Sequence, residues 1–173
     1  MNTILLKLDT VGNTSITSDF GSIDFVNKAN MKTLAVLHVL KCGYNALLTD
    51  VDVVFFKNPF DYLKCETCDI QIQREETSDS AKEKNSGFMY CCNLFFIRFV
   101  SNTPRSFSLF NIAWNNYQVH PNLRHQLALS YAIDEMLTAK LQMKLLPIHQ
   151  FSPGWYFFEE MHFVNLRDLP CFY

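Results

Sequence analysis

Three features that this sequence of 173 residues lacks limit the classes of function and the domain organisation that it can have. No uninterrupted apolar run approaches the length of a membrane span, and the N-terminus has too short an apolar stretch and too little basic charge for a signal peptide. No basic block exceeds a couple of residues and the net charge is −2, which argues against nucleic acid as the main partner. Repeats and low-complexity tracts are also missing, so residues 1–173 are expected to form a single domain.

Hydrophobic and aromatic residues are plentiful, at 49% and 14%, which indicates a globular protein with a sizeable core. The six cysteines are many for a cytosolic chain of this size. Cys65 and Cys68 form a C-x-x-C, and Cys91 and Cys92 are adjacent. Disulfides, free thiols, a redox pair and a zinc site all remain open. Adjacent cysteines fit zinc-ligand spacing poorly, and the C-x-x-C does not open a helix after a strand, as a thioredoxin-like pair would.

One or two disulfides are therefore favoured. Cys65 or Cys68 is expected to bridge to Cys91 or Cys92, because neighbouring sheet segments could bring these thiols within bonding range. The single N-glycosylation sequon, Asn13-Thr14-Ser15, points the same way as the cysteines, toward a secretory compartment.

Strand and helix patterns alternate through most of the chain, which predicts an α/β layered sheet. The 69–73 stretch alternates apolar and polar residues, as a half-buried strand does, and Pro104 is typical of a helix start. Helices are expected over 29–41, 104–114 and 127–141, and strands at 4–8, just before residue 50, and at 69–73, 88–100 and 145–148.

Two carboxylates, Asp50 and Asp52, are set between an apolar run and the Val53–Phe56 run. Buried acids need a compensating partner, and carboxylate oxygens are the preferred ligands of Mg²⁺ and Mn²⁺. A D-x-D triplet is also common by chance, so a strand-end turn with solvated acids is the alternative. The position at a strand edge favours a ligand site, since open α/β sheets bind ligands beyond their strand ends.

Four segments in series carry a family resemblance. They are K-x-x-x-x-x-x-x-L-K-x-G-Y-N from Lys32, L-L-T-D-V-D-V-V-F-F-K-N-P-F from Leu47, C-D-I-Q-I-Q from Cys68 and N-S-G-F-M-Y from Asn85. Together they resemble the nucleotide-diphospho-sugar transferase family, which includes plant cell-wall xylosyltransferases. The resemblance implies a GT-A-like open mixed sheet flanked by helices, with an incomplete Rossmann-like nucleotide-binding half. It also implies a metal-dependent, retaining glycosyltransferase with a nucleotide-sugar donor and a glycan or glycoprotein acceptor.

The resemblance assigns a role to each matching donor-site residue. Asp50 and Asp52 would hold Mn²⁺ or Mg²⁺, with Asp50 shared with the ribose. A divalent metal there would neutralise the charge that develops on the leaving diphosphate. Lys32 could face the phosphates, and a solvated helix charge is the alternative.

The sugar and acceptor pocket is assigned in the same way. Asn85, Ser86 and Gly87 would line it, with Gly87 allowing close backbone approach. A plain hairpin turn is the alternative for these three residues. Trp155 could stack against a sugar, with core packing as its default.

This sequence departs from the family at the late helix, where His125-Gln126 replaces an Asp-Gln pair. His125 could act as the base that activates the acceptor, because its unperturbed pKa is near neutrality, or the activity could be altered or lost. A helix cap or surface position is the alternative for His125. A non-catalytic sugar-binding homologue is therefore the second function, and a metal-dependent phosphohydrolase is a third.

The family pattern has an earlier strand–helix unit and a later His-Asn segment, neither of which this sequence contains. We therefore expect residues 1–173 to be one partial domain, without transfer activity by itself. Family members resemble type II Golgi proteins, so a Golgi or secretory-pathway lumen is expected, with membrane attachment only through a segment absent from this chain.

Overall fold

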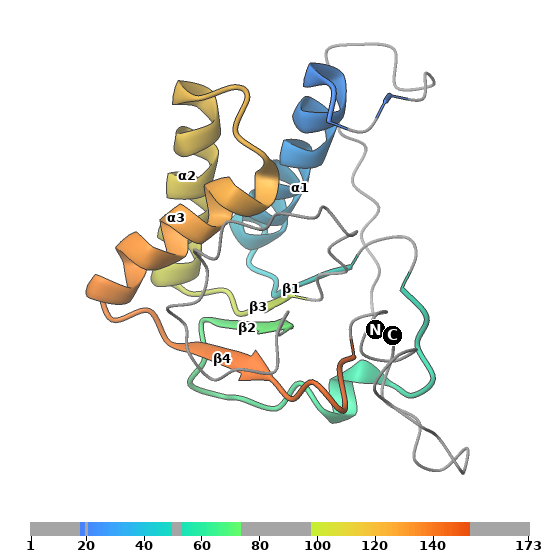
Figure 1. Cartoon of the computed structure of the whole chain (residues 1–173). Coiled ribbons are helices and arrows are strands. Elements are labelled where there is room, and N and C mark those ends of the chain that lie inside the picture. The colour runs from blue at the N-terminus through green and yellow to red at the C-terminus, as the bar shows by residue number, and fades with distance from the viewer. Residues whose placement is uncertain (1–17, 20, 50–52, 74–97, 153–173) are drawn as a thin grey trace. The chain divides into compact units, whose positions relative to one another are not determined.

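The structure is a computed structural model that describes residues 18–19, 21–49, 53–73 and 98–152 (Figure 1). Within these ranges the chain forms three α-helices, a short 3-10 helix and a four-stranded sheet. It divides into two compact units. Met1–Ala46 and Ser101–Leu141 contain the helices, whereas Leu47–Val100 and Gln142–Tyr173 contain nearly all of the sheet.

The first helix, α1, spans Ile23–Lys41 and begins earlier than the apolar pattern predicts. Its start is fixed by Ser22, whose hydroxyl oxygen accepts a hydrogen bond from the Phe25 N–H at 3.1 Å. Its end is marked by Gly43, which takes φ +84 and so has the left-handed conformation that glycine adopts without a steric penalty. One face of α1 is buried, at Val26, Asn30, Thr33, Val36, Leu37 and Leu40.

The other two helices, α2 at Pro104–Val119 and α3 at His125–Thr138, pack against each other and against α1 (Figure 1). Thr103 caps α2 by accepting from the Ser106 N–H at 3.1 Å, and Pro104 is in the first turn, as predicted. The buried faces of α2 and α3 consist of small and apolar side chains that allow close approach, at Leu109, Phe110, Ala113, Ala128, Leu129, Ala132 and Ile133.

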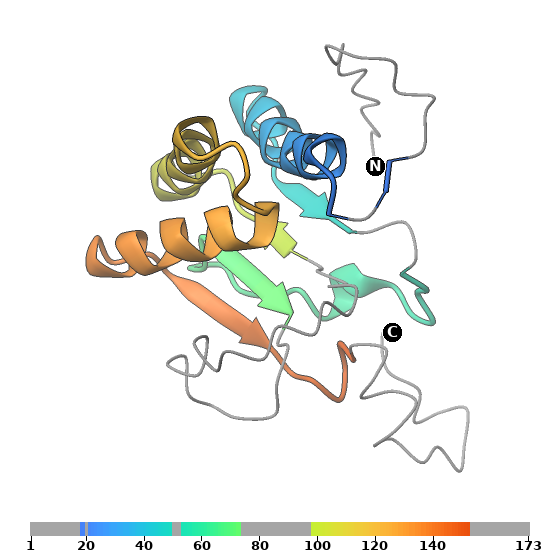
Figure 2. The ribbon, with the colours of Figure 1, turned by 45° about the horizontal axis from the view of Figure 1, so that its top comes forward.

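The sheet contains β1 (Ala46–Leu48), β2 (Ile70–Gln73), β3 (Arg98–Val100) and β4 (Met143–Leu146), in the order β1-β3-β2-β4. β2 pairs antiparallel with β3 and parallel with β4, and Figure 2 shows β2 in green between these two neighbours. The α/β fold class and the mixed sheet are confirmed.

Two expectations about the strands need correction. β2 was expected to be half-buried, but all four of its residues are buried, including Gln71 and Gln73. β4 begins at Met143, before the predicted start at 145. The strand expected at 4–8 lies outside the described residues, and only Arg98–Val100 of the 88–100 stretch is described.

In the part of the chain that the structure describes, no helix has the length and apolar character needed to cross a membrane.

Candidate functional site

Residues on either side of the two acids pack against one hydrophobic cluster. Leu63, Leu146 and Phe151 form this core cluster, and Leu47 and Val53 pack against it. Leu47 belongs to β1 and precedes the acids, whereas Val53 directly follows Asp52. Asp50 and Asp52 themselves lie outside the described residues. Their flanks are therefore anchored side by side on the core, as a strand-end ligand site requires.

The segment after the acids returns to the same cluster through a single turn of 3-10 helix, Pro59–Asp61. Asn58 caps this turn, because its side-chain oxygen accepts from the Phe60 N–H at 3.2 Å. Tyr62 then meets Phe151 edge-to-face, with ring centroids 6.4 Å apart, an arrangement that aromatic pairs prefer. The chain that follows the acids is thus fixed at Asn58 and Tyr62 as well as at Val53.

Two buried amides on β2 reach the same cluster through its backbone. Gln71 Nε2 donates to the Leu63 carbonyl at 3.4 Å, and Gln73 Nε2 donates to the Phe151 carbonyl at 3.3 Å. Both side chains project from the same face of the sheet, since alternate residues of a strand share a face. Sequence reasoning missed both residues. The signal available was the repeated I-Q-I-Q pattern, which was interpreted as solvent-facing alternation.

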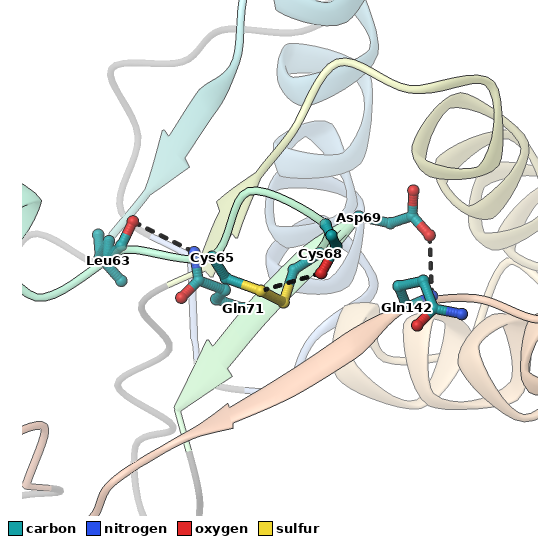
Figure 3. The surroundings of a disulfide bond; sticks show 7 residues. Leu63, Cys65, Cys68, Asp69, Gln71 and Gln142 are labelled. Carbon is teal, nitrogen blue, oxygen red and sulfur yellow. Dashed lines mark hydrogen bonds between the residues drawn. A yellow bond between two sulfur atoms is a disulfide. The ribbon is translucent and has the colours of Figure 1, made fainter.

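The C-x-x-C forms a disulfide within itself, between Cys65 and Cys68, with Cα atoms 5.4 Å apart (Figure 3). The expected bridge from this pair to Cys91 or Cys92 is therefore wrong. The physical reason is local: a tight loop between Leu63 and β2 already brings the two cysteines within the Cα separation that a disulfide needs.

The residue after this disulfide, Asp69, joins β2 to the start of β4 (Figure 3). Its fully buried carboxylate accepts from the Gln142 N–H at 2.8 Å, and its own N–H donates to the Gln142 carbonyl at 2.8 Å. A second buried charge is Arg98 on β3, which is 1% exposed and faces Ile72 across the strand pair. Such charges are costly to bury unless they are compensated, so both are specific features of the sheet.

Among the described residues, no group of three or more His, Cys, Asp or Glu side chains could hold a metal.

Comparison with known proteins identifies the family. The family model described as nucleotide-diphospho-sugar transferase matches residues 2–169. The chain belongs to this family.

Three curated relatives of the chain are named as sugar-transferring enzymes. A UDP-D-xylose:L-fucose alpha-1,3-D-xylosyltransferase of Arabidopsis thaliana is 27% identical over 161 residues, covering 84% of this chain and 41% of the relative. A UDP-galactose:fucoside alpha-3-galactosyltransferase of Dictyostelium discoideum is 35% identical over 82 residues, covering 46% of this chain and 12% of the relative. A beta-arabinofuranosyltransferase of Arabidopsis thaliana is 49% identical over 45 residues, covering 26% of this chain and 8% of the relative.

The chain thus spans well under half of the length of each of these transferases. No solved structure matches the chain.

Three residues that the family resemblance singled out are described, and all belong to the helical unit. His125 is the first residue of α3 and is buried, with 9% exposed, while the N-cap position is taken by Arg124. A surface or capping position for His125 is therefore wrong. Gln126 follows on the same helix and is partly buried, and Lys32 is partly buried in the middle of α1. Their catalytic and phosphate-binding roles stay predictions.

The remaining candidates of this transferase site lie outside the described residues: Asp50, Asp52, Asn85, Ser86, Gly87 and Trp155. What the structure adds is their immediate support. The described chain ends at Ser152, which is buried and donates to the Ile148 carbonyl at 2.9 Å, three residues before Trp155. The assignments of these six residues also stay predictions.

Proposed function

We propose that this protein transfers a glycosyl group from a nucleoside-diphosphate sugar to a glycan or glycoprotein acceptor. The single observation that supports this within the fold is the anchoring of Leu47 and Val53, on either side of Asp50 and Asp52, to one core cluster. Membership of the transferase family and relatives whose names specify UDP-sugar donors support the same reaction class.

The donor set suits a hard divalent cation. Asp50 and Asp52 would bind Mn²⁺ or Mg²⁺ through carboxylate oxygens, the ligand type that these ions prefer. When bound, such a metal would neutralise negative charge on the diphosphate as it leaves. In the transfer, the bond between the sugar's anomeric carbon and the diphosphate oxygen breaks, and the acceptor oxygen bonds to that carbon. The acceptor's proton must pass to a base, the role we assign to His125.

The proposed reaction retains the anomeric configuration, and the proposed location is the Golgi or another secretory-pathway lumen. The Cys65–Cys68 disulfide supports an oxidising compartment, because such bonds are rare in the cytosol.

Asp52→Asn tests the metal site directly. In the longest natural form of the protein, calorimetry with UDP and Mn²⁺ should show binding to the wild type and none to the variant, with the fold intact. Asp61→Asn is the matched control, since Asp61 is an exposed acid on the same segment and should leave binding unchanged. Equal affinity in wild type and Asp52→Asn, with and without chelator, would contradict the metal site.

A second function, binding without transfer, is favoured by one observation. His125 stands where the family pattern has an aspartate, and it is buried at the start of α3. Slow hydrolysis of a UDP-sugar by protein with Mn²⁺ would favour the transferase. Tight UDP binding without any turnover, in a protein supplied with acceptor, would favour the non-catalytic alternative.

A further inference from the structure

Gln71 and Gln73 occupy positions where apolar side chains would be expected. They are 0% and 4% exposed, and they alternate along β2 with Ile70 and Ile72. Burying an amide is costly unless its hydrogen bonds are satisfied. Each amide here makes one bond, through Nε2, and among the described residues neither Oε1 atom has a hydrogen-bond partner. Burying these amides therefore lowers the stability of the folded protein at both positions, a loss that a leucine or valine would avoid.

The two hydrogen bonds hold residues of the cluster against which the flanks of the two acids pack. Their acceptors are the carbonyls of Leu63 and Phe151, two of the three members of the core cluster. That cluster in turn anchors Leu47 and Val53, which flank Asp50 and Asp52. Apolar packing alone tolerates small shifts, whereas a hydrogen bond fixes distance and direction. The pair of amides thus fixes the backbone of the cluster from the centre of the sheet.

We infer that Gln71 and Gln73 are positioning residues, which hold the core cluster in register so that Asp50 and Asp52 are set for metal and diphosphate binding. The inference rests on the proposed function for the metal and nucleotide. It assigns the glutamines no contact with substrate, because both side chains are buried. Gln73 also holds Phe151, which is four residues before Trp155.

Gln71→Met and Gln73→Met remove the donor while keeping a long, unbranched side chain of similar volume. The matched control is Gln118→Met, because Gln118 is exposed on α2 in the helical unit. UDP binding is measured by calorimetry across a Mn²⁺ titration. Each core variant should need about tenfold more Mn²⁺ for half-maximal UDP binding, the scale of one lost buried hydrogen bond, and should regain wild-type affinity at saturating Mn²⁺. The control should match the wild type.

Recovery at saturating Mn²⁺ separates positioning from general damage to the fold. Hydrogen exchange without ligand provides the second measurement: backbone amides of residues 53–64 should lose protection in Gln71→Met, and those of 148–152 in Gln73→Met. Wild-type Mn²⁺ dependence in both variants would overturn the inference, as would unchanged protection. A wild-type protein that binds no UDP with Mn²⁺ would instead overturn the proposed function.

Glutamate substitutions provide a conditional rescue if the methionine variants fold poorly. Burial raises the pKa of a glutamate at either position, and a protonated carboxyl can donate to the same carbonyl. Gln73→Glu should therefore approach wild-type Mn²⁺ dependence at acidic pH and fall away from it as the pH rises. If the Mn²⁺ concentration for half-maximal UDP binding keeps a constant ratio between Gln73→Glu and the wild type across the pH range, the result would count against the positioning role.

Discussion

The helical unit and the sheet unit bury different chemistry. In the helices the buried polar residues are small or neutral, as at Asn30, Thr33 and Ser106, with His125 the exception. In the sheet unit most of them are large or charged, as at Asp69, Gln71, Gln73 and Arg98, with Ser152 the exception. Because a large or charged group is especially costly to bury unless it is compensated, the presence of four such residues in the sheet unit indicates a role beyond packing. The difference indicates that the helices supply a simple core and that the sheet carries the specific, position-setting contacts.

Two fully buried phenylalanines, Phe110 in the helical unit and Phe151 in the sheet unit, offer the sharpest test of this comparison. Replacing either with alanine removes a large side chain from a packed core and should lower the free energy of unfolding by about 3–5 kcal/mol. Only Phe151→Ala should also weaken Mn²⁺-dependent UDP binding, since Phe151 belongs to the cluster against which Leu47 and Val53 pack, on either side of the acids. Denaturant unfolding and calorimetry measure the two effects. Equal losses of UDP binding in both variants would break the distinction.

The disulfide is the next largest expected effect. Replacing Cys65 and Cys68 together with serine should lower the free energy of unfolding by about 2 kcal/mol, the chain-entropy estimate for so short a loop. Cys42→Ser is the control, because Cys42 is a free, exposed cysteine in the helical unit and its loss should change little.

The pairing itself can be checked by mass. Trypsin cleaves after Lys64 and Arg74, so protein from an oxidising host should release one peptide that contains both cysteines and is lighter by two hydrogen atoms than its reduced form. A peptide linked instead to Cys91 or Cys92 would contradict the local bridge.

The smallest effect is expected at the surface of the helical unit. Hydrogen bonds from Lys28 and then Ser18 hold the pKa of the exposed Asp24 carboxyl below its ordinary value. Because the folded pKa is the lower one, any stabilisation is present at neutral pH and is lost as the pH falls through that folded pKa. Asp24→Asn should leave unfolding at neutral pH unchanged in about 0.15 M salt, since exposed ion pairs contribute little. A carboxyl pKa measured by NMR at or above its ordinary value would contradict this.

The elements were predictable wherever one strong local signal dominated. Gly43 and Pro104 marked a helix end and a helix start, and the structure has both. The early start of α1 was missed because the Ser22 cap, a polar residue outside the apolar pattern, determines it. The mixed sheet followed from the family resemblance, since strand direction is decided by long-range pairing and not by local sequence.

The residues that hold the candidate site in place were less predictable from the sequence than the site residues themselves. Asp50 and Asp52 were recognisable as a motif, whereas Gln71 and Gln73 were interpreted as the polar side of a half-exposed strand. Alternation does not reveal which face is covered, and here both glutamines are buried and donate to the backbone of Leu63 and Phe151. The local cysteine bridge was missed for a related reason: pairing depends on loop geometry that spacing does not specify.

The parallel pairing of β2 with β4 has a consequence for how the protein is made. The sheet needs Met143–Leu146, whereas its partner Ile70–Gln73 leaves the ribosome much earlier, and α2 and α3 are synthesised in between. Helices form from neighbouring residues and fold quickly, but a parallel pair must wait for the distant strand. During that interval β2 exposes an open edge, the kind of edge that invites pairing with another chain. A nascent chain that stalls before Met143 is therefore the form most exposed to aggregation, and the form for which a chaperone matters most.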